Sequence, residues 1–517
     1  MSAVRLSELL IGLSGVADVG MGQPVGAASQ TCLAGVGLAR ALGLDDAAVS
    51  AVFYASLLQH VGCTAYSHEA SLLFGDEISI KRASVVTDFD RPREVLLGYL
   101  PRVVREAPSG ERVKTARNVL LRSGSLVEGY TRANCEVAAA VARRLGLPAA
   151  VGDGLLDTFE AWNGSGHPRA LSGDAISLVA RVVTVAACAA LFHRLGGPDA
   201  AVRAVRQRSA RAFDPAVVDA LCRHARSVFA ALTDAAAADP PVTVEPVPIW
   251  VDDAALGTVL RTFGEAVDLK APFLHGHSTE VARVAATAAT RLRLGAAEIR
   301  DVELAGYVYD IGRAAVPSAI WEAGGPLGAA AWSQVRLHAY QSEQILRRSP
   351  PLAGIGSIAG LHHERLDGSG YHRSALAGQL PTTARLLAVA DVWVAMTSDR
   401  PYRLALSPSR SAAELAAMVG RGELDADCVH AVVDAAGLRA PKRPRRSTAL
   451  TARQIEVLRL VAVGLSNPAI ARRLGISTRT AEHHVQDVYT RIGVSSRAAA
   501  ALYAMQHGLL DRTPLRG

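Results

Sequence analysis

The sequence predicts an all-α protein with two tandem copies of one helical domain and a small helical module at the C-terminus. Three observations support this fold class. The chain has 517 residues, half of them apolar, which is enough to form several cores. Aromatic residues make up only 5% of the chain, whereas Ala, Leu, Val and Arg, which favour helix over strand, are abundant. A short glycine motif occurs twice, as GSGHP and as GSGYH.

The residues around the two motifs are also similar, which extends the repeat to whole domains. Apolar residues within each copy recur every three or four positions, as do Val281, Val284, Ala285 and Ala288, and this spacing predicts amphipathic helices. The matching segments are Ala39–Gly62 with Thr290–Gly312, Phe159–Gly173 with His363–Gly378, Val179–Leu191 with Ala384–Met396, and Phe213–Leu221 with Leu424–Val432. We therefore predict helical domains at 1–235 and 251–436, the first with a longer middle.

Two proline-containing segments mark the boundaries between the predicted domains. Residues 236–250 are proline-rich and predict a linker, and residues 437–448 are both proline-broken and basic. From Pro441 to Gly517 there are 13 Arg and Lys against 4 Asp and Glu, whereas the preceding residues hold 42 against 44. The basic excess thus lies in the C-terminal module, 449–514, which indicates a polyanionic partner for that module.

Cysteine usage and hydropathy predict a cytoplasmic protein that does not associate with membranes. The six cysteines are scattered without a CxxC pair, which is typical of free thiols in a reducing compartment. The stretch 175–192 is apolar but contains Arg181 and is only about long enough to cross a bilayer. Its place in the repeat predicts a buried helix instead.

The C-terminal module has the signals of a helix-turn-helix. Thr451 and Gln454 form a capping-box pattern at the start of a helix that Gly464 ends. A short second helix follows Ser466-Asn467 and ends at Gly475, and Ser477 or Thr478 caps a third helix that continues to about Arg491. A short helix, a tight turn and a longer helix with exposed polar positions form the helix-turn-helix layout.

These residues resemble the LuxR-type (NarL-like) family of transcription regulators, with a four-helix DNA-binding domain. Gln454, Pro468 and Ala481 depart from the usual residues, and Pro468 falls in a first turn where proline is tolerated. The resemblance implies double-stranded DNA as a partner and binding as a homodimer. It places these residues at base edges or phosphates: Arg472, Arg473, Thr478, Arg479, Thr480, Glu482, His483 and Gln486.

The second helical copy carries four histidines and two aspartates on separate predicted helices. Imidazole and carboxylate ligands suit Fe, Mn or Zn, and two such ions about 3.5–4 Å apart can activate water for phosphoryl transfer. The candidate metal ligands are His277, Asp310, His338, His362, His363 and Asp391. Arg313, Arg400 and Arg403 are candidates for binding phosphate oxygens of a substrate.

This pattern resembles the HD-GYP branch of the HD phosphohydrolases, through HHERLDGSGY and ARLLAVADVWVAMTSDRPYR over about residues 268–436. The resemblance implies cyclic di-GMP hydrolysis at a site of two or three metals. Asp310 and Arg313 are the implied catalytic residues, and Arg313 takes the place of a substrate-binding lysine. His277, Asp310 and Asp391 would bind one ion, and Asp310, His338, His362 and His363 the other.

Two further substitutions separate this chain from the HD-GYP pattern. Tyr309 replaces the histidine of the His-Asp pair, and a phenol with a pKa near 10 is a poor substitute for a neutral imidazole. His372 replaces the proline of Gly-Tyr-Pro. The first copy has lost most of the ligands, since Ala27, His60, Thr158, Phe159 and Ala187 stand at the positions of His277, Asp310, His362, His363 and Asp391.

Three hypotheses for function follow. In the first, which we favour, the chain is a DNA-binding regulator whose helical body binds a cyclic dinucleotide or another phosphorylated small molecule, or mediates dimerisation. In the second, the chain is an active metal-dependent phosphodiesterase with a DNA-binding tail. In the third, the helical body is purely structural. Retention of most ligands in the second copy weighs against the third hypothesis, and Tyr309 weighs against the second.

Overall fold

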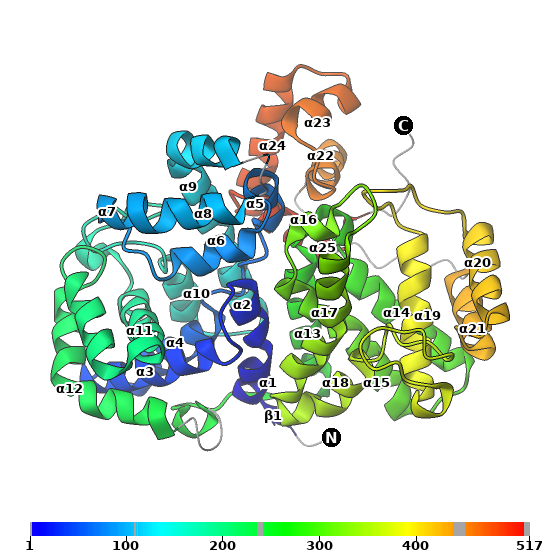
Figure 1. Cartoon of the computed structure of the whole chain (residues 1–517), viewed down its shortest axis with the longest axis horizontal. Coiled ribbons are helices and arrows are strands. Elements are labelled where there is room, and N and C mark those ends of the chain that lie inside the picture. Colours follow the sequence, from blue (N-terminus) through cyan, green and yellow to red (C-terminus); the bar gives the residue numbers. More distant parts are fainter. Residues whose placement is uncertain (1–2, 108–109, 111, 235–240, 438–449, 511–517) are drawn as a thin grey trace. The chain divides into compact units, whose positions relative to one another are not determined.

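The structure is a computed structural model that describes residues 3–107, 110, 112–234, 241–437 and 450–510. The chain divides into two compact units, Met1–Ala255 and Leu256–Gly517. Regular structure in the described residues is almost entirely helical (Figure 1). The predicted all-α class is confirmed.

The first unit packs its core around helices that recur in the second. Helix α3 contacts α4, α11 and α12, and α10 contacts both α4 and α9. The helices are α1 (Leu6–Leu13), α2 (Gly15–Gly20), α3 (Ala27–Ala41), α4 (Asp46–Leu58), α5 (Ser67–Phe74), α6 (Glu77–Ser84), α7 (Pro92–Glu94), the π-helix η1 (Val95–Tyr99), α8 (Leu100–Glu106), α9 (Arg112–Arg144), α10 (Ala149–Leu156), η2 (Gly173–Ala175), α11 (Leu178–Gln207), α12 (Pro215–Asp234) and η3 (Pro241–Val244).

Helix α11 contains the apolar stretch noted in the sequence. In the described residues it is the one helix long and apolar enough to cross a membrane. However, its backbone leaves helical geometry at Gly196 and Gly197. Val182, Val183 and Ala186 on this helix are fully buried where it packs on α3 and α4. Helix α11 is therefore a core helix of the first unit, as the repeat predicted.

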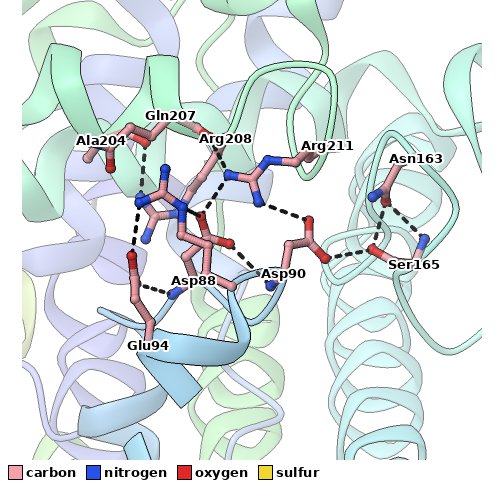
Figure 2. A network of polar contacts seen from close by, with 10 residues as sticks. Asp88, Asp90, Glu94, Asn163, Ser165, Ala204, Gln207, Arg208 and Arg211 are labelled. Atoms are coloured by element: carbon pink, nitrogen blue, oxygen red, sulfur yellow. Dashed lines mark hydrogen bonds and ion pairs between the residues drawn. The ribbon is translucent and has the colours of Figure 1, made fainter. Parts of the chain in front are cut away.

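The longer middle of the first copy consists of α5–α8 and the first part of α9. A polar network fastens this segment to the glycine-motif loop and to the end of α11 (Figure 2). Arg211 donates to Asp88 at 2.9 Å, and Ser165 in the glycine motif donates to Asp90 at 3.2 Å. Glu94 accepts from the backbone N–H of Asp88 at 3.1 Å. The middle segment is thus held by charge-assisted bonds.

Residues 241–251 belong to the first unit. Glu245 accepts from Ser7 at 2.8 Å and also from the hydroxyl of Tyr54. Strand β2 (Trp250–Val251) pairs antiparallel with β1 (Val4–Arg5). We predicted a linker at 236–250. Residues 235–240 lie outside the described residues, and within 241–250 Glu245 is buried whereas Val247 and Trp250 are exposed.

The second unit repeats this arrangement and adds the C-terminal module. Its first helices are α13 (Asp253–Asp268), η4 (Pro272–Leu274), α14 (His277–Arg291), α15 (Ala296–Val308), η5 (Ile311–Ala315), α16 (Ser318–Trp321) and α17 (Ala329–Arg347). They are followed by η6 (Pro350–Leu352), α18 (Ala353–Ala359), η7 (Ala377–Gln379), α19 (Thr382–Met396), α20 (Pro408–Gly420) and α21 (Ala426–Gly437). The predicted basic linker, 437–448, lies almost wholly outside the described residues.

The two copies share side-chain interactions as well as helix order. Arg181 pairs with Asp214 at 2.9 Å in the first copy, and Arg385 pairs with Asp425 at 2.9 Å in the second. Each glycine-motif loop also closes on a buried glutamate. Glu160 accepts from two backbone N–H groups of its loop, and Glu364 accepts from two in the same way. Matching interactions at matching positions are expected of two copies of one domain.

The C-terminal module has four helices, α22 (Ala452–Ala462), α23 (Asn467–Leu474), α24 (Thr478–Ile492) and α25 (Arg497–Gln506). The capping box of Thr451 and Gln454 is present, and the Ser477 hydroxyl caps α24 through the Thr480 N–H. Gly475 adopts a left-handed conformation, with φ at 65°, where α23 ends. The predicted helix-turn-helix layout is confirmed.

Candidate functional site

The six predicted ligands come from five helical segments and converge in the second unit. His277 is the first residue of α14, and Asp310 precedes η5. His338 lies within α17, and Asp391 lies within α19. His362 and His363 follow α18. All except His363, which is half-buried, are at most 4% exposed.

The ligands form two groups that can each hold an ion. We call His338, His362 and His363 the histidine group, and His277, Asp310 and Asp391 the acidic group. Within each group the candidate ligand atoms all lie within 4.8 Å of one another. Asp310 connects the groups, because its Oδ1 lies 3.1 Å from Nε2 of His338.

Backbone carbonyl groups fix which nitrogen of the histidine group faces inward. Nδ1 of His362 lies 2.7 Å from the carbonyl oxygen of Ala359, and Nδ1 of His338 contacts the carbonyl oxygen of Val335. These contacts place the proton on Nδ1 of both rings and leave both Nε2 atoms as acceptors. The two Nε2 atoms lie 3.2 Å apart. Two acceptors at this distance, beside a carboxylate, fit a bound cation.

Burial and charge keep these side chains in their ligand forms. Burial lowers the pKa of His277 and of His362 to about 4, so both imidazoles are neutral at neutral pH. Burial alone would raise the pKa of Asp310, but the positive charge of Arg313 outweighs it and lowers that pKa. Neutral imidazole and ionised carboxylate are the forms that bind metal.

Tyr309 occupies the acidic group where the HD-GYP pattern has a histidine. Its side chain is fully buried, and its hydroxyl donates to Oδ1 of Asp391 at 2.8 Å. Nε2 of His277 lies 3.2 Å from the same carboxylate oxygen. Burial and the neighbouring Asp391 raise the pKa of Tyr309 well above its ordinary value, so the phenol stays protonated.

The three predicted substrate-binding arginines have different surroundings. Arg313 pairs with Asp310 at 2.5 Å, and its guanidinium lies over the ring of Trp321 at 5.1 Å. Arg400 lies over the ring of Phe273 at 5.1 Å, and burial and the charge of Arg313 lower its pKa. The charges of the two guanidinium groups repel each other, and an anion bound by both would relieve this repulsion.

Arg403 has a different arrangement from the other two arginines. Its guanidinium donates to the carbonyl oxygens of Ala395, Met396, Ser398 and Leu404, at and beyond the C-terminal end of α19. In this structure Arg403 is a helix-capping residue. These bonds occupy both terminal nitrogens of Arg403, and its expected phosphate role stays a prediction.

The glycine-motif loop places an aromatic ring over one ligand. The Tyr371 ring stacks on His363 with the centroids 4.3 Å apart. A Cβ atom on Gly370 would lie 2.5 Å from Cα of Glu364, so only glycine allows the loop to approach this closely. His372, at the position of the motif's proline, lies edge-on to Tyr340.

The first copy contains a pseudo-site without the ligands. Gly62 packs against the backbone of Asn134 as Gly312 packs against that of His338, which aligns Asn134 with His338. The ammonium of Lys81 donates to the carbonyl oxygen of Cys63 at 2.7 Å and to the Ser67 hydroxyl at 3.1 Å. The described residues of this copy form no metal-ligand group. This copy thus contains a buried lysine ammonium held by Cys63 and Ser67.

Asp268 was not predicted as a functional residue, although the repeat contains a signal for it. Asp268 accepts from the Ser278 N–H at 3.0 Å and the Ser278 hydroxyl at 2.8 Å, which fixes the helix start that carries His277. In the first copy Asp18 accepts from the Ala28 N–H at 2.9 Å. Each aspartate stands nine residues before the first residue of the following helix, so the spacing was present in the sequence.

The predicted DNA-contacting residues lie together on one exposed surface of the C-terminal module. Ala481, Val485, Val488 and Tyr489 form the buried face of α24. The residues on the opposite face and in the last turn of α23 are all exposed: Arg472, Arg473, Thr478, Arg479, Thr480, Glu482, His483 and Gln486. An exposed, polar second helix of a helix-turn-helix is the element that enters a major groove.

Comparison with known proteins identifies two families along the chain. Residues 261–428 match the HD domain, and residues 448–504 match the luxR family of bacterial regulatory proteins. Over 412 residues the chain is 30% identical to a 3'3'-cGAMP-specific phosphodiesterase 3 of Vibrio cholerae, spanning 78% of this chain and 88% of that protein. A crystal structure of the cyclic GMP-AMP-specific phosphodiesterase V-cGAP3 of V. cholerae matches with a TM-score of 0.57 and 25% identity.

That structural match covers 85% of this chain and 99% of the other, an extent that requires the first helical copy to be included. The luxR-family region is 50% identical over 62 residues to the probable transcriptional regulatory protein NarL of Mycobacterium tuberculosis. That match spans 12% of this chain and 29% of the regulator. The predicted resemblances to HD and LuxR-type proteins are both confirmed.

Proposed function

We propose, for a chain that belongs to the HD-domain family of 3'3'-cGAMP-specific phosphodiesterase 3 and ends in a luxR-family domain, that it is a DNA-binding regulator controlled by a cyclic dinucleotide. The second HD domain binds the dinucleotide at a buried divalent-metal site. The single observation that carries this proposal is the pair of inward-facing Nε2 atoms beside Asp310.

The residues around the site suit a phosphodiester. His338, His362, His363 and Asp310 would hold one ion, which when bound supplies a Lewis acid and a water of lowered pKa. Arg313 and Arg400 bind the phosphate oxygens, since Arg400 has no carboxylate partner among its described contacts. Fe, Mn and Zn all suit this donor set.

A second candidate function, hydrolysis of the bound dinucleotide, is favoured by the assembly of the acidic group next to the histidine group. Turnover of cyclic di-GMP or 3'3'-cGAMP by the full-length protein, with Fe and Mn each supplied, tests this function. Hydrolysis that disappears on removal of the metal would establish it. Binding without hydrolysis would leave the protein a sensor.

Replacing Arg400 with alanine is expected to weaken cyclic dinucleotide binding about tenfold or more, because one charge-assisted contact to phosphate contributes about 1.5–3 kcal/mol. Calorimetric titration of the full-length, metal-loaded protein with cyclic di-GMP and with 3'3'-cGAMP measures the change. Arg410→Ala, which alters an exposed arginine of the same domain, is the matched control. Equal affinity in both variants would remove Arg400 from the proposed pocket, and no binding by the wild-type protein would contradict the proposed function.

A second prediction concerns the DNA-binding module, namely the salt dependence of its affinity for DNA and its preference for particular bases. Arg479→Ala is expected to weaken binding to all DNA sequences and to reduce the slope of log K against log salt by about 0.9. Gln486→Ala is expected to cost about 1–3 kcal/mol, and only at sites with the preferred base. Site selection followed by anisotropy titration at several salt concentrations separates the two effects. Arg421→Ala, in the HD domain, serves as the control, and unchanged slopes and preferences would place the DNA contact elsewhere.

A further inference from the structure

We propose that the two ligand groups bind metal with unequal affinity. The histidine group fills first, because Tyr309 lowers the affinity of the acidic group for metal. This inference rests on the proposed function, because it concerns the metals of the same site. It goes beyond that function in predicting a one-ion resting state. The ligand class is a divalent transition-metal ion with a preference for nitrogen donors.

The histidine group is ready to bind as it stands. Its inward nitrogens already have their orientation fixed by the carbonyl oxygens of Val335 and Ala359. Trp321 also packs edge-on against the His338 ring, with the centroids 5.4 Å apart. Outer contacts of this kind hold a ligand in place and typically change metal affinity about 10- to 100-fold. An ion entering here displaces no existing hydrogen bond of His338 or His362 Nε2.

The acidic group differs because the carboxylate that it does not share, Asp391, is already engaged in a hydrogen bond. Oδ1 of Asp391 accepts from the Tyr309 hydroxyl at 2.8 Å and faces Nε2 of His277 at 3.2 Å. An ion bound by Asp391 must compete with the Tyr309 hydrogen bond. The Tyr309 side chain is fully buried, so the displaced hydroxyl has no solvent to replace its acceptor.

The acidic group also has fewer donors of its own. With tyrosine at 309, His277 supplies the one imidazole of the group. Asp310, its other carboxylate, is shared with His338 and paired with Arg313 at 2.5 Å. Positive charge on Arg313 reduces the attraction of this carboxylate for a second cation. The small number of donors and the charge of Arg313 both lower the affinity of the acidic group for metal. We therefore expect one tightly bound ion per chain.

Titration of metal-free, full-length protein with Mn²⁺ tests the inference, read by bound metal per chain and by electron paramagnetic resonance. The wild-type protein is expected to bind one equivalent tightly, with the spectrum of an isolated Mn²⁺, and a second at least about tenfold more weakly. Tyr309→His is expected to bind two equivalents of similar affinity with an exchange-coupled spectrum. Tyr402→His, which adds a histidine at an exposed position of the same domain, is expected to behave as wild type.

Asp391→Asn keeps the inference testable if the Tyr309 variant fails to fold, because it should lose only the weak equivalent. Two equal, coupled ions in the wild-type protein would overturn the inference and leave the proposed function intact. Loss of the tight ion in Asp391→Asn would overturn it as well. Failure of the wild-type protein to bind any Mn²⁺ would instead overturn the proposed metal site itself.

Discussion

Asp310→Asn is expected to lower the metal retained by the full-length protein at least about tenfold, a larger effect than any other single ligand change. Asp310 is the carboxylate shared by the two groups, since it belongs to the acidic group and lies 3.1 Å from the inward nitrogen of His338. Asparagine keeps the shape of the side chain and removes its charge. Position 310 then supplies no negatively charged ligand to either group.

The same substitution leaves Arg313 without its partner. This guanidinium is 7% exposed and pairs with Asp310 at 2.5 Å. A buried cation that loses its counter-charge costs about 3–5 kcal/mol of folding free energy. We therefore expect the variant to unfold at a lower denaturant concentration, and His362→Thr provides a second way to remove a ligand. Threonine is the residue at the matching position, Thr158, of the first copy.

Elemental analysis after gel filtration measures the retained metal, and circular dichroism reports whether each variant is folded. Asp427→Asn, at an exposed position of α21, is the matched control and is expected to retain wild-type metal. Wild-type metal content in both Asp310→Asn and His362→Thr would show that these residues do not form a metal centre. Loss of metal in the control would point to a general effect of charge.

Gly312→Ala is expected to destabilise the second HD domain by about 3 kcal/mol or more, because overpacking at a rigid contact forces the backbone to move. A Cβ atom at Gly312 would lie 2.0 Å from the carbonyl oxygen of His338 and 2.6 Å from the backbone nitrogen of Ser342. The Gly312 N–H also donates to the Ser342 hydroxyl at 2.8 Å. Helix α17 therefore cannot accept an added methyl group without shifting His338.

Urea unfolding followed by circular dichroism measures this effect, with separate transitions expected for separate domains. Gly378→Ala is the control, since nothing lies within 4 Å of its added Cβ. A variant at Gly312 as stable as that control would mean that α17 does not press on the turn that carries Asp310. Because His338 lies at this contact, metal retention should fall together with stability.

Local signals in the sequence were sufficient for much of the fold. Thr451, Gly475 and Ser477 mark helix ends by chemistry that acts within a few residues, and all three take the expected roles. The internal repeat predicted the shared helical domain because matching segments preserve the same apolar spacing. The candidate ligands were predicted from motifs that resemble the HD-GYP pattern, and the structure brings their ligand atoms together in two groups.

The features missed from the sequence depend on residues distant along the chain. Glu245 accepts a hydrogen bond from Ser7, which is 238 positions away in the sequence. No local pattern indicated that 241–251 would belong to the first unit. Tyr309 reaches Asp391 across 82 positions, so the hydrogen bond that distinguishes the two ligand groups required the fold. The bonds from Arg403 to the carbonyl groups at the end of α19 likewise could not be read from the residue type alone.

The buried lysine of the first copy has a consequence for how the two copies depend on their surroundings. The positive charge of Lys81 belongs to the chain itself, and its ammonium group donates to the Cys63 carbonyl oxygen and the Ser67 hydroxyl. An ion bound by the second copy comes from solution, and its contribution to stability grows with its free concentration. On the proposed function, the stability of the second copy would therefore depend on the supply of metal, whereas the buried charge of Lys81 would not. Duplication of the domain would in this way give one half with a fixed buried charge and one half that can respond to metal.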